Sequence, residues 1–142
     1  ALGGTLHQRT QELDGKRDHR MDRTIPVDER FEDKHPIDIQ SGGLFEELFD
    51  GAHRVMVNSL HAQSIDQPGE GVFVEALSDD GVIEAVSVPD APALTFGVQW
   101  HPEHPNVRGN DVNGRLFKAF HAAVCEHHAQ RSGSEGADSE AA

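Results

Sequence analysis

Residues 96–103 read Phe-Gly-Val-Gln-Trp-His-Pro-Glu, and this stretch decides the fold that we predict for the chain. Residues 93–98 form a short apolar run without polar alternation, which predicts a strand covered on both faces in a parallel α/β sheet. Pro102 has no amide hydrogen, so it ends the strand just after His101. Open α/β sheets bind ligands at the carboxyl ends of their strands, which makes His101 a candidate functional residue.

Glu103 follows His101 at a spacing that suits proton transfer chemistry. A carboxylate can accept a hydrogen bond from one ring nitrogen of a histidine and leave the other nitrogen free as a base. Two residues make a weak motif, so a loop histidine beside a surface carboxylate is the alternative interpretation.

The composition describes a polar, acidic chain. Its 142 residues suit one domain or a piece of one, with 36% hydrophobic residues and a formal net charge of -13. The negative charge argues against nucleic acid as a partner, because phosphate contacts need clustered Lys and Arg. No apolar stretch approaches the roughly 20 residues that span a bilayer, so we expect no membrane partner.

The single cysteine, Cys125, is compatible with a reducing compartment, and we expect a cytoplasmic protein. It lies in residues 116–125, where apolar residues recur at helical spacing. We therefore interpret Cys125 as a helix residue rather than a nucleophile, since reactive thiols usually lie at a helix N-terminus or a strained turn.

Residues 9–57 predict a loop followed by three short elements. The charged residues 9–34 show no clear period and predict a long loop or lid. Residues 35–40 alternate apolar and polar side chains as a half-buried strand does, residues 44–49 predict a short helix, and residues 53–57 predict a second strand.

Residues 71–77 and 82–88 both have strand character, and Asp80-Gly81 between them predicts a β-hairpin. Glu75 and Glu84 within these strands indicate one solvated face. A final helix is expected over residues 112–129, capped by Asn110 or Asp111. Residues 131–142 hold no large apolar side chain and predict a disordered acidic tail.

Four segments resemble a known family. Residues 97–103, Gly-Val-Gln-Trp-His-Pro-Glu, resemble the His-Pro-Glu signature of class I glutamine amidotransferases. Residues 57–63 (Val-Asn-Ser-Leu-His-Ala-Gln), 2–8 (Leu-Gly-Gly-Thr-Leu-His-Gln) and 80–86 (Asp-Gly-Val-Ile-Glu-Ala-Val) narrow the resemblance to the gamma-glutamyl-gamma-aminobutyrate hydrolase family. The four segments occur in the same order as in that family, and the resemblance extends to about Gln130.

The resemblance implies the C-terminal part of a flavodoxin-like α/β domain and a Cys-His-Glu triad that hydrolyses gamma-glutamyl amides. His101 matches the family's catalytic base and Glu103 the residue that orients it. A loop facing the gamma-glutamyl group corresponds to four candidate substrate contacts: Asn58, Ser59, His61 and Gln63. Gamma-glutamyl-gamma-aminobutyrate, a small molecule of polyamine degradation, is the implied substrate.

The family's nucleophile lies in a Cys-Arg-Gly turn before the Leu-Gly-Gly-Thr-Leu segment, with which this sequence begins. We therefore expect residues 1–130 to be the C-terminal portion of the domain, with the nucleophile half as a missing partner. We also expect the 142-residue chain alone to be inactive, and to expose apolar sheet surface where the missing half packs. A homo-oligomer is possible.

Two alternative functions stay open: the glutaminase part of an ammonia-channelling amidotransferase, and a catalytically dead binding module. We expect no cofactor and no metal, because Pro102 and Pro105 prevent a helix from aligning His101 with His104, and because adjacent residues such as His127 and His128 point to different helix faces. The remaining histidines are interpreted as surface or turn residues: His7, His19, His35, His53 and His121.

Overall fold

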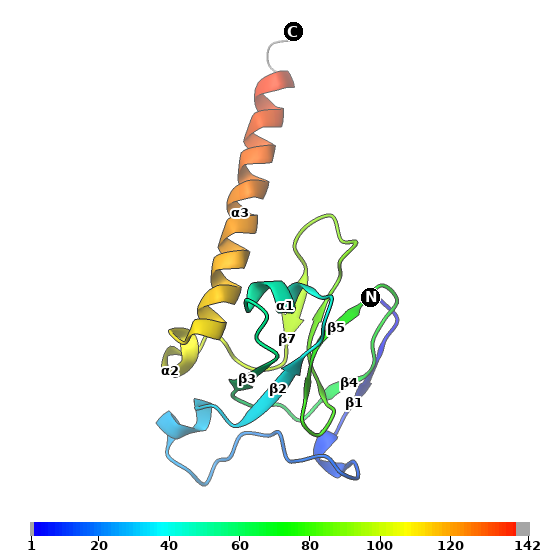
Figure 1. Ribbon diagram of the computed structural model, residues 1–142, viewed down its shortest axis with the longest axis vertical. Helices are drawn as coiled ribbons and strands as arrows, with labels where there is room; N and C mark the ends of the chain where they lie inside the picture. The colour runs from blue at the N-terminus through cyan, green and yellow to red at the C-terminus, as the bar shows by residue number, and fades with distance from the viewer. Residues whose placement is uncertain (1, 139–142) are drawn as a thin grey trace.

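The computed structural model describes residues 2–138, which form a mixed α/β fold around one seven-stranded antiparallel sheet (Figure 1). The sheet order is β1-β4-β6-β5-β2-β3, and β7 pairs with β6. The strands are β1 (Thr5–His7), β2 (His35–Ile39), β3 (Arg54–Val57), β4 (Ser64–Gln67), β5 (Phe73–Ser78), β6 (Ile83–Ser87) and β7 (Phe96–Val98). The helices are the 3-10 turns η1 (Thr10–Glu12) and η2 (Val27–Phe31), α1 (Leu44–Leu48), α2 (Pro105–Arg108) and α3 (Asp111–Asp138).

The predicted hairpin is confirmed as β5 and β6. The two strands are antiparallel, with Val74 opposite Val86. Gly81 has φ +77°, a left-handed conformation that glycine adopts without strain. The predicted elements at 35–40, 44–49 and 53–57 correspond to β2, α1 and β3, and residues 9–34 form a long loop with two 3-10 turns. The sequence reasoning missed β1 and β4.

The prediction of a parallel strand over residues 93–98 is wrong. The strand β7 is antiparallel to β6, with Gly97 opposite Val86, and Gly97 is exposed. Only residues 88–95 connect the two strands. A parallel pair needs a crossover of roughly a dozen residues or more, so this short connection dictates the antiparallel arrangement.

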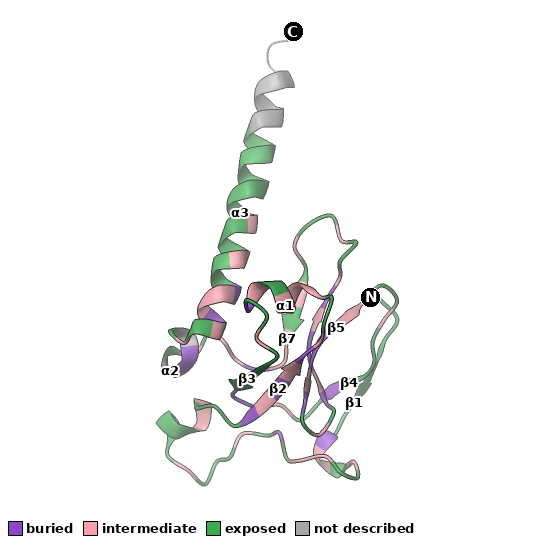
Figure 2. Ribbon diagram, in the orientation of Figure 1, coloured by how far each residue is buried: buried purple, intermediate pink, exposed green. Residues whose placement is uncertain are grey.

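The hydrophobic core lies between the sheet and the two helices α1 and α3. Phe45 of α1 is fully buried, and its ring contacts Phe49, Phe96 and Trp100 at centroid distances of 5.3, 5.8 and 6.3 Å. Leu116 is the buried residue that α3 contributes to this core. Buried residues gather on β2, β5 and β6, whereas most described residues of α3 beyond Leu116 are exposed (Figure 2).

Glu75 is buried, which contradicts its expected place on a solvated face. Its carboxylate accepts hydrogen bonds from the backbone amides of Leu44 (3.0 Å) and Phe45 (2.8 Å) and from the Ser87 hydroxyl (2.5 Å). It therefore supplies a negative charge and acceptors to the N-terminus of α1, which lacks a side-chain cap of its own.

We predict that Gly43→Ala lowers the free energy of unfolding by about 1–3 kcal/mol, because overpacking strains a tight site. A Cβ at Gly43 would lie 2.5 Å from Cε1 of Phe73 and also too close to the carboxylate of Glu75, which its hydrogen bonds hold in place. The control is Gly114→Ala in α3, where a Cβ meets no heavy atom of the described residues within 4 Å. That change should stabilise the chain by about 0.5–1 kcal/mol. Urea unfolding measures the free energy of unfolding of both variants. Equal changes for the two variants would contradict the prediction.

The final helix, α3, is longer than predicted. Asn110 caps it as expected, because its Oδ1 accepts a hydrogen bond from the Asn113 amide at 2.8 Å. It then continues to Asp138, past the predicted end at residue 129, so the expected disordered tail does not match the structure over residues 131–138. The glycines and serines there weaken a helix by at most about 1 kcal/mol each, and no proline interrupts it. Residues 139–142 lie outside the described part of the chain.

Among the described residues, no helix combines the length and the apolar character that crossing a membrane demands.

Candidate active site

His101 and Glu103 lie just after β7 and are hydrogen-bonded to each other. The distance from His101 Nδ1 to Glu103 Oε1 is 2.8 Å. A carboxylate only accepts hydrogen bonds, so in the neutral ring Nδ1 carries the hydrogen and Nε2 keeps its lone pair. The two side chains are 45% and 63% exposed, which leaves Nε2 accessible to a reacting group. The structure thus places the predicted pair in the geometry of a base and its orienting carboxylate, while their catalytic roles stay predictions.

The pKa of Glu103 lies below its usual value. Partial burial of the carboxyl acts to raise the pKa, but the hydrogen bond from His101 outweighs it, together with a backbone hydrogen bond and the charges of His101 and His104. Glu103 is therefore ionised at neutral pH and able to hold the His101 ring in one tautomer.

Asn58 fixes the backbone of His101 from the end of β3. The His101 amide donates to Asn58 Oδ1 at 2.8 Å, and Asn58 Nδ2 donates to the His101 carbonyl at 3.1 Å and to the Phe31 carbonyl at 3.3 Å. Asn58 is only 1% exposed. Its expected contact with substrate is untested, and the structure shows that its amide positions His101.

Trp100 anchors the same segment in the core. Its side chain is buried, and Nε1 donates to Asn113 Oδ1 in α3 at 3.0 Å. Asn113 Nδ2 in turn donates to the Val107 carbonyl at 3.0 Å, which links α2 and α3. The residue before His101 is therefore held in the core, so that the histidine projects from a rigid support.

We predict that Asn58→Leu lowers the free energy of unfolding by about 2–3 kcal/mol, since it leaves the partly buried amide and carbonyl of His101 without the partners that Asn58 supplies. The matched control is Gln63→Ala, which removes an exposed amide and should change stability by less than about 0.5 kcal/mol. Urea unfolding of both variants measures the difference. Similar midpoints for the two would show that the Asn58 contacts contribute no stability.

The other residues of the predicted substrate loop point in different directions. Ser59 is buried, and its hydroxyl donates to the His19 carbonyl at 3.0 Å. His61 Nδ1 lies 2.8 Å from the Gln63 carbonyl, which also accepts a hydrogen bond from Gln99 Nε2 at 2.7 Å. The Gln99 contact brings this loop against the segment that carries His101, but the contact of any of its residues with substrate remains a prediction.

Two histidines and a glutamate that the sequence assigned to the surface are buried. The side chains of His19, His35 and Glu84 are all 0% exposed. His19 Nε2 lies 3.0 Å from Asp80 Oδ2, in the hairpin turn. Burial lowers the pKa of His19 more than the charges of Asp80 and Glu84 raise it, so His19 is mainly neutral at pH 7. Alternation within a single strand gave no signal for these three residues, because they come from three separate segments of the chain.

Two further contacts involve Cys125 and His104. Cys125 is exposed on α3, where its Sγ lies 3.6 Å from Nε2 of His121. It is thus a helix residue, as expected. His104 stacks on Phe31 of η2 with ring centroids 3.6 Å apart, which joins the long loop to the segment after His101.

Comparisons with known proteins agree on one family. A model of the Peptidase C26 family matches residues 1–103. The gamma-glutamyl-gamma-aminobutyrate hydrolase PuuD of Escherichia coli is 38% identical over 128 residues, which cover 90% of this chain and 49% of that protein. A putative glutamine amidotransferase of Mycobacterium tuberculosis is 36% identical over 135 residues, covering 95% of this chain and 39% of that protein. The chain spans about half the length of the first of these relatives.

Proposed function

Because this chain belongs to the Peptidase C26 family, we propose that it forms part of an enzyme that hydrolyses gamma-glutamyl amides. The observation that carries the proposal is the 2.8 Å hydrogen bond from His101 Nδ1 to Glu103, which leaves Nε2 free at an exposed strand end. A nucleophile-activating base needs this arrangement: one ring nitrogen held by a carboxylate and the other open to the nucleophile.

In the proposed mechanism, His101 Nε2 takes the proton from a cysteine thiol that lies outside this sequence. The thiolate attacks the gamma-carbonyl carbon, and His101 then gives its proton to the leaving amine as the C–N bond breaks. A thioester to the gamma-carboxyl group remains. His101 next takes a proton from water as the resulting hydroxide attacks the thioester carbonyl. The C–S bond then breaks, His101 returns its proton to the thiolate, and the gamma-carboxylic acid ionises to the free gamma-carboxylate.

The proposed substrate is gamma-glutamyl-gamma-aminobutyrate, which would yield glutamate and gamma-aminobutyrate. The similarity to the gamma-glutamyl-gamma-aminobutyrate hydrolase of Escherichia coli supports this choice. A second candidate is the release of ammonia from glutamine, which is favoured by the putative glutamine amidotransferase of Mycobacterium tuberculosis. Both reactions use the same base and carboxylate and differ only in the leaving amine.

We place the remainder of the enzyme against the apolar surface that this part exposes. Phe120 and Val124 on α3 are 56% and 49% exposed, and Met56 on the edge strand β3 is 45% exposed. Apolar side chains grouped on a helix usually mark a covered face, and an edge strand offers unpaired backbone groups to a further strand.

The test is an assay of the full reading frame that contains this sequence. We expect release of gamma-aminobutyrate from gamma-glutamyl-gamma-aminobutyrate, with a kcat/KM at least about tenfold above that for ammonia release from glutamine, a difference of about 1.4 kcal/mol. The reverse preference would favour the glutaminase function. Turnover of neither substrate would favour a binding module. The 142-residue chain, assayed alongside, should be inactive.

A further inference from the structure

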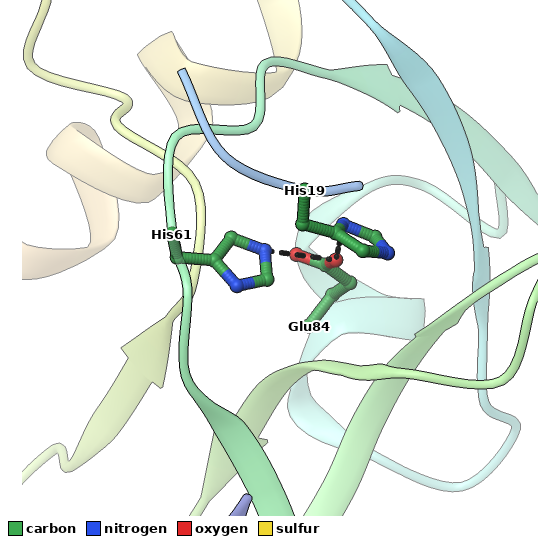
Figure 3. Close-up of side chains that lie close together, drawn as sticks. All are labelled: His19, His61 and Glu84. Carbon is green, nitrogen blue, oxygen red and sulfur yellow. Dashed lines mark ion pairs between the residues drawn. The ribbon is translucent and has the colours of Figure 1, made fainter. Parts of the chain in front are cut away.

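Four buried side chains converge from separate parts of the chain. His19 lies in the long loop, His35 begins β2, His61 lies in the loop after β3, and Glu84 lies in β6. Nδ1 of His19, Nε2 of His35 and Nε2 of His61 are each 3.5 Å from Glu84 Oε1. The side chains are 0%, 0%, 9% and 0% exposed, in the order in which they are named above. Figure 3 shows the rings of His19 and His61 each directing a nitrogen at the Glu84 carboxylate.

Each of the three imidazoles has its other nitrogen occupied by an acceptor. His35 Nδ1 lies 3.1 Å from the Pro36 carbonyl, and His61 Nδ1 lies 2.8 Å from the Gln63 carbonyl. Carbonyl oxygens only accept, so in the neutral rings Nδ1 carries the hydrogen and Nε2 presents a lone pair.

The third imidazole, His19, has the opposite tautomer. Its Nε2 lies 3.0 Å from a carboxylate oxygen of Asp80, so in the neutral ring the lone pair is on Nδ1. The Ser59 hydroxyl, 3.1 Å from this Nδ1, donates to the His19 backbone carbonyl and so does not require a hydrogen on the ring nitrogen.

In this arrangement a nitrogen lone pair of each histidine faces the carboxylate of Glu84, which itself can only accept hydrogen bonds. Within the described part of the chain, both Glu84 oxygens and the Nε2 atoms of His35 and His61 are buried without a hydrogen-bond partner. Each such atom costs about 1–3 kcal/mol when it stays unsatisfied. A cation bound between them would satisfy all of them at once.

The separations suit a metal ion. Zinc binds histidine nitrogen and carboxylate oxygen at about 2.0–2.2 Å, so the ligand atoms of a tetrahedral site lie roughly 3.4 Å apart. The three nitrogen-to-oxygen distances in the cluster are 3.5 Å. The ligand atoms of His19, His61 and Glu84 all lie within 4.8 Å of one another, a spread that small side-chain rotations can close.

We propose that His19, His61 and Glu84, with His35 as the fourth ligand, bind a divalent transition metal ion, with Zn²⁺ as the preferred ion. Three imidazoles and one carboxylate are a donor set that zinc accepts in tetrahedral geometry. The Asp80 carboxylate and the two backbone carbonyls fit the outer contacts that metal-binding histidines make through their second nitrogen.

The proposed ion has a structural role. All four ligands come from the protein, three are fully buried and the His61 side chain is only 9% exposed, which is typical of a closed structural site rather than a catalytic one. It would fasten the long loop and the loop after β3 to the sheet. Asn58, three residues before His61, holds the His101 backbone, so the ion would also stiffen the support of the candidate base.

The experiment uses the full-length protein stripped of metal with a chelator. Titration with Zn²⁺ should give one tightly bound equivalent, measured by calorimetry and elemental analysis. Co²⁺ in place of zinc should give the intense visible absorption of a tetrahedral ion without the charge-transfer band of a thiolate ligand. This spectrum needs no variant, so it tests the site even where a substitution prevents folding.

Two variants of the site and two controls locate the ion. Glu84→Gln, which keeps the side-chain shape, should weaken Zn²⁺ binding by at least about 100-fold, and Asp80→Asn by about 10–100-fold. His53→Ala, and the double variant His127→Ala with His128→Ala, change histidines outside the cluster and should bind as the unaltered protein does. The proposal is overturned if no ion binds, if Glu84→Gln binds normally, or if the helix double variant abolishes binding.

Discussion

His101→Ala in the full-length enzyme is expected to lower kcat/KM by about 10³-fold. General base catalysis by a positioned side chain contributes about 10²–10⁴-fold, and a thiol without its base stays largely protonated near neutral pH. The structure indicates that alanine is tolerated there, because the side chain is 45% exposed and the backbone contacts of His101 with Asn58 do not involve the ring. Loss of activity with an unchanged unfolding midpoint would therefore report chemistry rather than misfolding.

Glu103→Gln distinguishes the orienting role of the carboxylate from the role of the base. Glutamine keeps the size of the side chain but carries no charge, and its amide can donate to Nδ1 and so select the wrong tautomer. We expect kcat/KM to fall by about 10–10³-fold, less than for the loss of His101 itself. The matched control is Glu126→Gln on the exposed part of α3, which should leave the rate unchanged.

The result that would contradict the proposed function is full activity of His101→Ala. A glutaminase mechanism predicts the same loss for both variants, so the choice between the two substrates depends on the assay of the leaving amine. The metal proposal is independent of this outcome, because it is tested by binding and not by turnover.

The sequence predicted elements whose signals are local. Asp80 and Gly81 specify a tight turn between two apolar runs, and the structure has the hairpin at that place. The pairing of His101 with Glu103 is also local, since only Pro102 separates them in the chain. Proline at 102 and the buried Trp100 fix the backbone on either side of the histidine.

Contacts between segments that are distant in the chain could not be predicted from the sequence. Glu75 and Glu84 occupy strand positions where alternation predicts solvent exposure, yet both are buried. Glu75 can be buried because the amides of Leu44 and Phe45, about thirty residues earlier, donate hydrogen bonds to its carboxylate. Glu84 is buried under histidines from three other segments, and no spacing rule relates those positions to one another.

The parallel strand was mispredicted for a similar reason. A continuous apolar run reports that both faces are covered but not which neighbour the strand has. The connection from β6 to β7 is too short for a crossover, and this length was a usable signal in the sequence. The described residues form an antiparallel sheet within a mixed α/β fold, which fits the family that the sequence resembles.

Phe45→Ala is expected to lower the free energy of unfolding by about 3–5 kcal/mol, a large share of the 5–15 kcal/mol that a typical domain has. Phe45 has no exposed surface, and its ring lies in edge contact with those of Phe96 and Trp100. Removing it leaves a cavity beneath the strand that carries the candidate base. Phe45→Leu should cost less than half as much, because leucine refills most of the volume.

Trp100 is the single tryptophan of the sequence, and so its fluorescence reports directly on this part of the core. Urea unfolding followed by that signal should show the loss for Phe45→Ala, and the matched change Phe120→Ala on exposed α3 gives the comparison within this chain. If the remainder of the protein covers that face, Phe120→Ala should lower the free energy of unfolding more in the full-length enzyme than in this chain alone. Equal costs for Phe45→Ala and Phe120→Ala in the chain alone would contradict the location of the core between the sheet and α1.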